Sequence, residues 1–321
     1  MQHIAVLRGG WSEEREVSLK SGQYVLDNLD RTKYKVTDVI VNNWQDILKL
    51  ADLSVDVAFL ALHGKGGEDG RVQSLLELMG IRYTGASVEA SVIGFDKFLF
   101  KQVMRASNVN VPKDIVLDYK ARRLWIGDGT GYKELYGRVC LKHTQSAVKE
   151  YLSYPVFVKP DVSGSSFGVT KVKAPKELTP AIKLAKKFGN RVIIEQAIEG
   201  LELTIGFVGK HLLPPVLIKP KKGEFFDYAS KYEQGGAEEI CPAPVSKKIQ
   251  KALKEEAKNV IAGLGDVKYG RIDAMYSEKE DKIYILEINT LPGMTPTSLL
   301  PQEARAYGWT DARLLEEIIE A

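Results

Sequence analysis

The chain has 321 residues, of which 44% are hydrophobic and 27% are charged, and its formal net charge is +3. This composition is typical of a globular protein with two or three hydrophobic cores. The small net charge does not indicate a nucleic-acid or membrane partner, and the sequence lacks the run of about 18 apolar residues that a transmembrane helix needs. No signal peptide is expected, and Cys140 and Cys241 are expected to stay reduced in a cytoplasmic setting.

The first part of the chain alternates predicted strands with a predicted helix. Strands are expected at residues 4–7, 34–41 and 55–62, and a helix at residues 17–29. This order predicts a parallel sheet with right-handed crossovers. Ligands of such sheets lie beyond the carboxyl ends of the strands, and the loops there are residues 9–15 and 63–70.

The rest of the chain predicts two further α/β units, with boundaries near residues 96 and 200. Strands are expected at residues 155–160, 192–195, 204–208 and 212–219, and helices at residues 96–107, 180–188 and 247–264. Residues 113–150 are basic and rich in glycine, and their pattern does not indicate an arrangement. Residues 220–239 are polar and contain glycines, so we expect a mobile loop there.

The most informative stretch lies near the end of the chain. Residues 283–288 are apolar at every position but one, which is typical of a strand in the middle of a sheet. Glu287 and Asn289 share one face of this strand, and Asp273 adds a carboxylate from the preceding strand of a hairpin. These oxygens suit Mg²⁺, which usually completes its coordination with water and substrate phosphates. The alternative is a buried ion pair between Arg271 and Glu287.

A nucleotide needs a phosphate-binding element, and neither the P-loop pattern nor the dinucleotide pattern Gly-x-Gly-x-x-Gly occurs in the sequence. Lys159 ends an apolar strand and leads into a loop of small residues, 163–168. Such loops can direct backbone N–H groups and hydroxyls at phosphate oxygens. The alternative is a flexible hairpin connection with a lysine whose ammonium group reaches solvent.

Three further charged residues near element ends have both a functional and a structural interpretation. Lys97 follows Asp96 at the start of a helix, where lysines are most often solvated. Glu195 ends an apolar strand and Glu202 follows it closely, so either could accept a hydrogen bond from a ribose hydroxyl. Carboxylates at strand ends are, however, more often exposed to solvent.

The loop after the first strand carries acids at the ligand-facing edge of the predicted sheet. Glu14 could bind an ammonium group there. The alternative is helix capping, with Ser12 as N-cap and the acids in the first turn. His63 directly follows the third strand, in a position suited to a substrate contact or to a structural role.

Together these segments resemble the D-alanine:D-alanine ligases of the ATP-grasp superfamily. The matching stretches occur in the order of the family over nearly the whole chain, and only residues 113–150 have no convincing match. The stretches are GGWSEEREVS (9–18), LHGKGGEDG (62–70), YTG (83–85), DK (96–97), VKP (158–160), GSSFG (164–168), YASKY (228–232), GRID (270–273), EINTLPGMT (287–295) and SL (298–299).

The resemblance implies an α/β fold with α+β character in its ATP-grasp part. A Rossmann-like N-terminal substrate domain with a parallel sheet would span residues 1–96. A small central ATP-grasp domain would span residues 97–202. A C-terminal ATP-grasp domain at residues 203–321 would carry the metal and second-substrate sites.

The resemblance also implies a set of ligands and binding residues. ATP would be the co-substrate, two Mg²⁺ or Mn²⁺ ions would bind to Asp273, Glu287 and Asn289, and K⁺ would be an activator. Lys97 and Lys159 would contact the ATP phosphates, residues 195–198 the adenine and Glu202 the ribose. The full set of expected ATP-binding residues is Lys97, Lys159, Ser166, Glu195, Gln196, Ala197, Ile198, Glu202 and Phe225.

The implied reaction joins two D-alanine molecules through an acyl phosphate for peptidoglycan precursor synthesis, and releases ADP and phosphate. Glu14 would bind the ammonium group of the first D-alanine beside His63, and Arg271 and the N–H of Gly293 would face the developing oxyanion. Lys231 would reach the transferred phosphate, and Ser298 and Leu299 would bind the carboxylate of the second D-alanine. A latch that closes residues 220–239 over the site would consist of Glu14, Ser165 and Tyr232.

Three other functions are compatible with these motifs. A D-alanine:D-lactate ligase, a ligase for other amino acids and a non-catalytic nucleotide-binding relative would share most of these residues. Family members are commonly dimers, so a homodimer without nucleic-acid or membrane partners is expected. One departure from the family pattern is Arg8, a charge just before the two glycines, whose side chain we expect to point to solvent.

Overall fold

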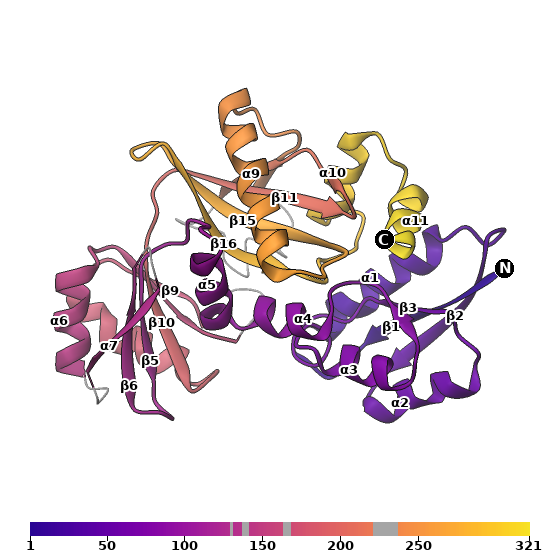
Figure 1. The fold of residues 1–321 in the computed structure, drawn as a ribbon, viewed down its shortest axis with the longest axis horizontal. Helices are drawn as coiled ribbons and strands as arrows, with labels where there is room; N and C mark the ends of the chain where they lie inside the picture. Colours follow the sequence, from indigo (N-terminus) through magenta and orange to yellow (C-terminus); the bar gives the residue numbers. More distant parts are fainter. Residues whose placement is uncertain (129–130, 137–140, 163–167, 221–236) are drawn as a thin grey trace.

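The computed structural model describes residues 1–128, 131–136, 141–162, 168–220 and 237–321, and the structural statements below refer to these residues. Three β-sheets follow one another along the chain, and helices pack against each of them (Figure 1). Within the described residues, no helix has an apolar stretch of the length needed to cross a membrane.

The N-terminal sheet has the strand order β2-β1-β3-β4, and every neighbouring pair is parallel. The prediction of a parallel sheet is therefore confirmed, although the third strand is shorter than predicted. The strands are β1 (Gln2–Gly9), β2 (Tyr34–Val41), β3 (Val57–Leu60) and β4 (Arg82–Tyr83). The helices between them are α1 (Arg15–Asn28), α2 (Trp44–Leu48), the 3₁₀-helix η1 (Lys49–Asp52) and α3 (Arg71–Leu78).

The central sheet has the order β7-β6-β5-β10-β8-β9, and neighbouring strands in it are antiparallel. Its strands are β5 (Asp114–Asp118), β6 (Arg123–Gly127), β7 (Tyr132–Tyr136), β8 (Val156–Pro160), β9 (Thr170–Val172) and β10 (Arg191–Gln196), with helices α6 (Leu141–Tyr151) and α7 (Pro175–Ala185). The stretch that the sequence left unassigned thus forms β5, the hairpin β6–β7 and α6.

Helix α7 begins earlier than the predicted range 180–188. Pro175, and not Pro180, occupies the start of the helix, and Pro180 lies inside it. Proline is favoured at the first helical position because its fixed φ suits a helix and no N–H is required there. Two prolines in one segment therefore left the start ambiguous in the sequence.

The C-terminal sheet has the order β14-β13-β11-β15-β16, and β12 pairs with β11. Its strands are β11 (Leu201–Val208), β12 (His211–Leu212), β13 (Val216–Pro220), β14 (Ala237–Ile240), β15 (Tyr269–Ser277) and β16 (Lys282–Asn289), and helix α9 (Lys247–Leu264) packs against it. The range predicted for α9 is confirmed. The predicted strand at residues 212–219 is divided into β12 and β13 by Pro214 and Pro215, which lack the N–H that a strand ladder requires.

Two helices connect the sheets. Helices α4 (Val88–Phe95) and α5 (Lys97–Ala106) meet at Asp96, whose Oδ1 accepts hydrogen bonds from the N–H groups of Phe98 and Leu99 (Figure 1). Buried residues of α5 belong to the hydrophobic core of the C-terminal sheet. The start of α5 is therefore fixed in position between the central and C-terminal sheets.

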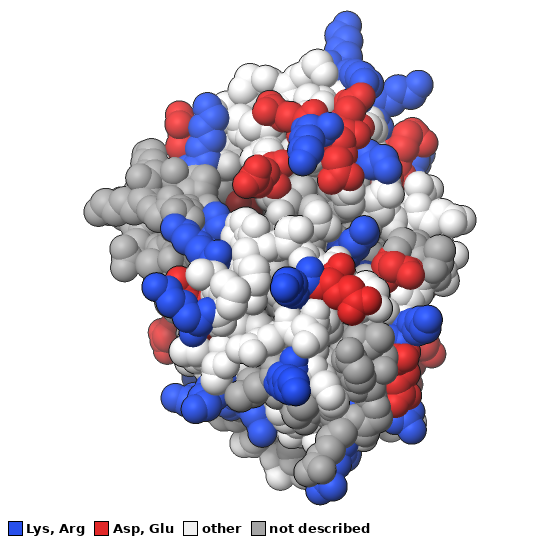
Figure 2. Space-filling view, turned by 90° about the vertical axis from the view of Figure 1, so that its left-hand side faces the viewer, with Lys and Arg blue, Asp and Glu red and all other residues white. Residues whose placement is uncertain are grey.

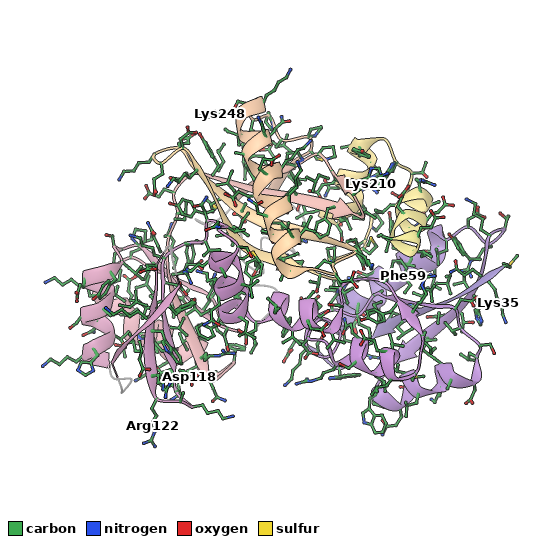
Figure 3. The ribbon with its side chains drawn as sticks, viewed as in Figure 1. Lys35, Phe59, Asp118, Arg122, Lys210 and Lys248 are labelled. Carbon is green, nitrogen blue, oxygen red and sulfur yellow. The ribbon has the colours of Figure 1, made fainter. Side chains whose placement is uncertain are left out.

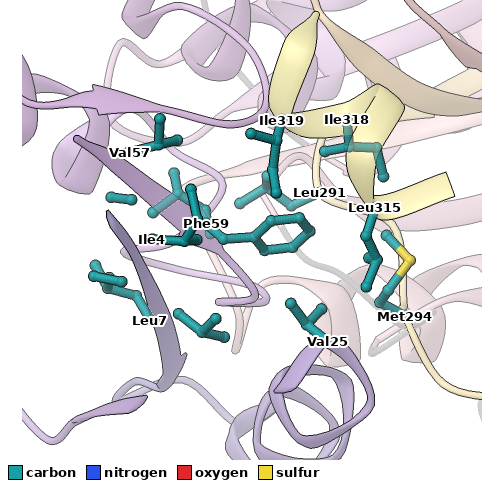
Figure 4. Packing of buried hydrophobic residues seen from close by; sticks show 14 of the residues in the cluster. Ile4, Leu7, Val25, Val57, Phe59, Leu291, Met294, Leu315, Ile318 and Ile319 are labelled. Atoms are coloured by element: carbon teal, nitrogen blue, oxygen red, sulfur yellow. The ribbon is translucent and has the colours of Figure 1, made fainter. Parts of the chain in front are cut away.

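The chain ends on the N-terminal sheet. Helices α10 (Leu299–Tyr307) and α11 (Asp311–Glu320) contribute buried residues to the same core as β1, β3 and α1. Figure 4 shows the ring of Phe59 directed toward Leu315 of α11 and Met294. In Figure 3, Phe59 lies in the interior, whereas Lys35 and Lys248 extend outward. The last part of the sequence thus closes a core that the first part begins.

Arg8 does not point to solvent as expected. Its guanidinium donates two hydrogen bonds to Asp38, at 2.7 and 2.6 Å, and its side chain is 13% exposed. A Cβ on Gly22 would lie 2.4 Å from the Arg8 Cβ, so the arginine packs directly against α1. The charge before the two glycines is therefore neutralised by the neighbouring strand β2.

Candidate active site

A cleft of about 570 Å³ opens where the carboxyl edge of the N-terminal sheet meets β16 and the loop after it. Its wall combines segments that lie far apart in the sequence, several of which were singled out by separate motifs. The predicted site residues that line it are Glu14, His63, Lys97, Arg271, Glu287, Asn289, Gly293, Ser298 and Leu299. The fold therefore brings both ends of the chain and its middle to one cavity.

The acidic hairpin forms as predicted, but β16 is the last strand of its sheet among the described residues and not a middle strand. Its isoleucines are buried in a core shared with helices α4 and α9. Asp273 on β15 lies opposite Glu287 on β16, and Arg271 lies opposite Asn289. Asp273 accepts two hydrogen bonds from Arg271, both at 2.8 Å, and one each from Asn289 (3.1 Å) and the Thr204 hydroxyl (2.7 Å). Although burial opposes it, the charge of Asp273 raises the pKa of Arg271. The guanidinium thus pairs with Asp273, not with Glu287 as the ion-pair alternative supposed.

Glu287 pairs with Lys97 instead. The Lys97 Nζ lies 3.0 Å from a carboxylate oxygen of Glu287, and the lysine side chain is only 12% exposed. Burial by itself would lower the pKa of Lys97, but the charge and hydrogen bond of Glu287 outweigh it and raise the pKa. Lys97 is therefore not a solvated surface residue. It reaches across the cleft from the first turn of α5.

The donor set of the hairpin fits a hard divalent cation. Asp273, Glu287 and Asn289 offer side-chain oxygens from neighbouring strands, as Mg²⁺ prefers. Without ligands, Arg271 and Lys97 balance the two carboxylates, and among the described residues no group of three His, Cys, Asp or Glu side chains is arranged to hold a metal. An anionic nucleotide could take over the two cations and leave the oxygens free for metal ions.

The second predicted phosphate ligand lies in the central sheet. Lys159 on β8 is 8% exposed, and its Nζ donates to Glu195 on β10 at 2.8 Å. The reading of a lysine that reaches solvent is therefore wrong. Glu195 is 3% exposed, so the reading of a solvent-exposed carboxylate is wrong as well. Burial by itself would raise the pKa of Glu195, but the charges of Lys101 and Lys159 outweigh it and lower the pKa.

The segment expected to line the adenine joins the central and C-terminal sheets. Gln196, Ala197 and Ile198 are half-buried between the end of β10 and the start of β11, and Glu202 is half-buried on β11. The N–H of Gln196 donates to Lys113 O (2.9 Å) and that of Ala197 to Pro155 O (3.3 Å). Their place between two sheets suits a planar base, and the adenine contact stays a prediction.

The loop after β1 is ordered by hydrogen bonds of Ser12. Its hydroxyl donates to His63 O at 2.6 Å and accepts from the N–H of Glu14 at 3.1 Å. Glu14, not Ser12, is the residue before α1, so the expected N-cap role of Ser12 is wrong. A Cβ on Gly64 would lie 2.7 Å from a Glu14 carboxylate oxygen, so only glycine leaves room for Glu14 to lie against this loop.

His63 connects three segments of the cleft wall. It is 6% exposed, its Nδ1 lies 3.0 Å from Leu291 O, and its Nε2 lies 2.8 Å from the Ser21 hydroxyl. A carbonyl only accepts, so Nδ1 carries the proton and Nε2 accepts from Ser21. The Ser21 oxygen in turn accepts from the N–H of Met294 at 3.0 Å. This chain of hydrogen bonds holds the loop after β16 against the N-terminal sheet.

The loop after β16 leads into the N-terminus of α10 at the cleft. Ser298 precedes this helix, and its hydroxyl accepts from the N–H of Thr295 at 2.9 Å. A Cβ on Gly293 would lie 3.0 Å from the Ser298 Oγ. Free N–H groups at a helix N-terminus attract carboxylates. The geometry therefore suits an anionic group near Ser298 and Leu299.

Five predicted site residues lie outside the described residues. They are Ser165, Ser166, Phe225, Lys231 and Tyr232. The roles expected for them, including the latch with Glu14, stay predictions.

Comparisons with known proteins agree with these motifs. The family profile described as "D-ala D-ala ligase C-terminus" matches residues 134–320, and "D-ala D-ala ligase N-terminus" matches residues 45–86. The chain is 38% identical over 317 residues to D-alanine–D-alanine ligase B of Clostridium perfringens, which covers 99% of this chain and 97% of that protein. It is 37% identical over 317 residues to D-alanine–D-alanine ligase of Buchnera aphidicola, with 99% and 98% covered. The chain belongs to the D-alanine–D-alanine ligase family.

Solved structures of D-alanine–D-alanine ligases have the same fold. The chain superimposes on the ligase of Bacillus anthracis with a TM-score of 0.82 at 31% identity, covering 100% of this chain and 97% of that one. The structure of that ligase complexed with ATP matches equally, at 30% identity. The VanG D-Ala:D-Ser ligase of Enterococcus faecalis also has a TM-score of 0.82, at 27% identity with 99% and 98% covered. Fold and family are thus established together.

Several residues of the ligase cleft were missed in the sequence. Lys20 on α1, Glu68, Glu239 and Thr297 line the cavity, but none of them was predicted as a site residue, although Glu68 belongs to the stretch 62–70. Lys20 lies four residues after Glu16, so the helical spacing of residues 17–29 could have placed it on the same face as the acids. Glu239 was predicted as the end of the mobile loop 220–239, but it belongs to the strand β14, which pairs with β13.

Proposed function

We propose that this chain catalyses the ATP-dependent ligation of two D-alanine molecules to D-alanyl-D-alanine. An acyl phosphate is the intermediate, and ADP and phosphate are released. The observation that carries the proposal is one cleft in which Glu287 of the β15–β16 hairpin and its partner Lys97 meet the loop of Glu14 and the N-terminus of α10. Family membership supports the same reaction.

The chemistry explains why such a cleft is needed. A free carboxylate is a poor acyl donor because its leaving group would be oxide. Phosphorylation by ATP converts that oxygen into a phosphate leaving group, and the amine of a second amino acid then attacks the carbonyl carbon. Phosphoryl transfer depends mainly on positioning and on neutralisation of charge. The lysines and the arginine of the cleft wall supply positive charge where the phosphate is transferred.

The first substrate would bind beside the N-terminal sheet. Glu14 offers a carboxylate for an ammonium group, and the loop of Ser12, Gly64 and His63 holds this part of the cleft wall in place. The carboxylate of the same amino acid would then face Lys97 and Arg271. This places the group to be phosphorylated next to the positive charges.

Divalent metal ions would bind to Asp273, Glu287 and Asn289. Mg²⁺ or Mn²⁺ at these oxygens would neutralise the phosphates and orient the triphosphate. Lys97 and Lys159 would bind phosphate oxygens. Arg271 would leave Asp273 and contact the reacting carboxyl group. K⁺ would act as an activator.

The tetrahedral intermediate needs fixed hydrogen-bond donors. Arg271 and Gly293, in the loop after β16, both line the cleft. Donors fixed before the reaction stabilise developing negative charge without reorganisation. We infer that these two groups bind the oxyanion formed when the second amine attacks.

The second D-alanine would bind at the N-terminus of α10. The helix dipole and the N–H groups of the first turn of α10 favour its carboxylate. The amine would then face the acyl phosphate. Since the structurally similar VanG protein is a D-Ala:D-Ser ligase, the acceptor must be tested directly, and D-serine, D-lactate and other amino acids are the alternatives.

The setting follows from the product. D-Alanyl-D-alanine is a building block of peptidoglycan precursors, so we propose a role in cell wall biogenesis and cell shape. We also propose that the protein acts in the cytoplasm as a homodimer, with small molecules and not nucleic acids or membranes as its ligands.

A substrate panel tests the proposed function. Purified protein with ATP, Mg²⁺ and K⁺ is incubated with D-alanine, L-alanine, D-serine or D-lactate, phosphate release is measured, and the product is identified by mass. We expect phosphate release with D-alanine and a product of the mass of the dipeptide. Phosphate release without D-alanine, or no phosphate release at all, would contradict the proposal. A product in which D-alanine is joined to D-serine or D-lactate would assign another acceptor.

A further inference from the structure

The hairpin β6–β7 adds two strands to the edge of the central sheet, within the part of the sequence that matched no family motif. The register places one residue of each strand in a row across the sheet. From the outer edge inward, this row is Tyr132, Gly127, Asp114 and Glu195. Directly paired residues point to the same face of a sheet. The row therefore leads from the hairpin to a residue expected in the ATP site.

Gly127 makes contact along this row possible. A Cβ at this position would lie 2.3 Å from Asp114 Oδ1 and 2.6 Å from Arg105 Nη1. Because glycine has no side chain, the phenol of Tyr132 reaches over β6 and donates to Asp114 Oδ2 at 2.5 Å. The ring of Tyr132 also lies against Phe98 of α5, with centroids 4.7 Å apart. The hairpin is thus attached to both β5 and α5.

Asp114 is the centre of a buried group of charges. It is fully buried, it accepts a hydrogen bond from Arg105 Nη2, and its Oδ1 lies 3.8 Å from Lys101 Nζ. The guanidinium carbon of Arg105 lies 4.6 Å from the centroid of the Tyr132 ring. Tyr132 therefore contacts both members of the Arg105–Asp114 ion pair: its hydroxyl contacts Asp114, and its ring contacts Arg105.

Lys101 carries the network on to the ATP site. Its side chain is 1% exposed, and its ammonium group pairs with one carboxylate oxygen of Glu195 while Lys159 donates to the other at 2.8 Å. Lys101 also donates to Pro112 O at 3.0 Å. With Glu195 held between two lysines, the position of the Lys159 ammonium group depends on the buried charges behind it.

The charges of this network do not cancel. With every group ionised, Lys101, Arg105 and Lys159 carry three positive charges against the two negative charges of Asp114 and Glu195, and burial lowers the pKa of Lys101. Burial makes each unmatched charge costly unless an anion meets it. The excess positive charge ends at Lys159, where the nucleotide phosphates are expected.

We propose that the hairpin β6–β7 positions the nucleotide site, with Tyr132 as a positioning residue that acts through Asp114 and Lys101 on Glu195 and Lys159. The inference rests on the proposed function, since Lys159 and Glu195 are expected ATP contacts. It assigns a role to a segment in which no family motif was recognised from the sequence alone.

The test compares two tyrosine-to-phenylalanine variants in the same domain. Tyr132→Phe removes the hydroxyl that donates to Asp114. Tyr119→Phe is the matched control, because Tyr119 also lies under a cation, Lys186 Nζ at 4.1 Å, but packs against the core on the opposite face of the sheet. Binding of Mg-ATP is measured by calorimetry without D-alanine, and KM is then measured for ATP and for D-alanine.

We expect Tyr132→Phe to weaken ATP binding and raise KM for ATP by about tenfold, the scale of one hydrogen bond to a charged group. KM for D-alanine should stay near the wild-type value, and Tyr119→Phe should bind ATP as the wild type does. Gly127→Ala should give the same pattern, because its Cβ would displace Asp114.

Two results would overturn the inference, and they can be told apart. If Tyr132→Phe lowers the melting temperature but binds ATP like the wild type, the hairpin is only structural and the proposed function stands. If the wild type itself binds no Mg-ATP, the proposed function fails and the inference fails with it. Should Gly127→Ala not fold, Tyr132→Phe alone decides.

Discussion

Arg271 and Asp273 stand two residues apart on β15, and they form a hydrogen-bonded ion pair at the wall of the cleft. The same side chains are expected to separate during the reaction, Asp273 toward a metal ion and Arg271 toward the oxyanion. A pair of this kind keeps both charges neutralised before substrates bind, since an unpaired buried charge is costly. Arg271 and Asp273 therefore pair with each other in the absence of ligands. When ligands bind, each is expected to contact a ligand instead.

Arg271→Ala tests the oxyanion role. We expect ATP to bind still, whereas dipeptide formation falls by at least about 10²-fold because a fixed donor to the intermediate is lost. Phosphate release and product mass are the measurements. Arg8→Ala is the control, since Arg8 forms a comparable two-bond pair with Asp38 away from the cleft. Near-normal turnover of Arg271→Ala would contradict the role.

Glu287→Gln tests the metal site. The amide keeps the shape but loses the charge, so we expect the Mg²⁺ concentration for half-maximal activity to rise at least about tenfold. The control is Glu280→Gln on the same hairpin, where Glu280 accepts from the Tyr284 hydroxyl at 2.6 Å outside the cleft. An unchanged Mg²⁺ requirement in Glu287→Gln would count against this residue as a ligand.

At the scale of elements, α10 is joined to β11 through a buried acid. Glu303 is fully buried and accepts from the N–H of Gly206 at 2.9 Å. A Cβ on Gly206 would lie 2.3 Å from the Glu303 Oε2, so glycine allows the helix to pack this closely. Burial raises the pKa of Glu303 well above its ordinary value of 4.5. Burial thus favours the protonated carboxyl group at this contact, although the hydrogen bond from Gly206 favours the ionised one.

Glu303→Gln predicts a change in the pH dependence of stability. The folded protein keeps the Glu303 proton at a pH where the unfolded chain has released it, so stability falls as pH rises above about 4.5 toward the folded pKa. The glutamine variant should lack this contribution. Melting temperatures between about pH 5 and 8 measure it, with Glu317→Gln on α11 as the control. Parallel curves for the wild type and Glu303→Gln would refute it.

Most elements could be predicted from the sequence because their patterns are local. The helix at residues 247–264 has apolar residues at helical spacing, and the strand at residues 34–41 is bounded by polar turns. The hairpin β6–β7 was not predictable, since its strands are short and its register depends on pairing with β5. The buried partners of Glu195 were missed for the same reason. Lys101 lies on α5, and most strands of the central sheet come between it and Glu195 in the sequence.

At the scale of the whole molecule, the two ends of the chain share one core. Phe59 of β3 packs toward Leu315 of α11, and both are fully buried (Figure 4). The same closure brings the loop after β16 onto the N-terminal sheet, where His63, Ser21 and Met294 are linked by hydrogen bonds. On the surface seen in Figure 2, basic and acidic side chains both occur and neither sign covers the whole face. The shared core thus holds together the two segments that form one wall of the cleft.

A double-mutant cycle tests the shared core. Leu315→Ala should lower the free energy of unfolding by about 2–5 kcal/mol, because it leaves a cavity next to Phe59. Combined with Phe59→Leu, it should show a coupling of about 0.5–3 kcal/mol, as residues in contact do. Chemical denaturation measures both, and Leu184→Ala on the exposed side of α7 is the control. Additive effects would show that the ends of the chain do not share a core.

The sequence by itself determined the family, the order of many strands and helices, and nine of the residues that line the cleft, because motif spacing and apolar periodicity are properties of neighbouring residues. Only the tertiary structure decided which charges pair. Arg271 binds Asp273 and Lys97 binds Glu287, and Tyr132 reaches Asp114 across a glycine. These contacts join distant segments, and their energies depend on burial and on distances of a few ångströms that no local pattern encodes.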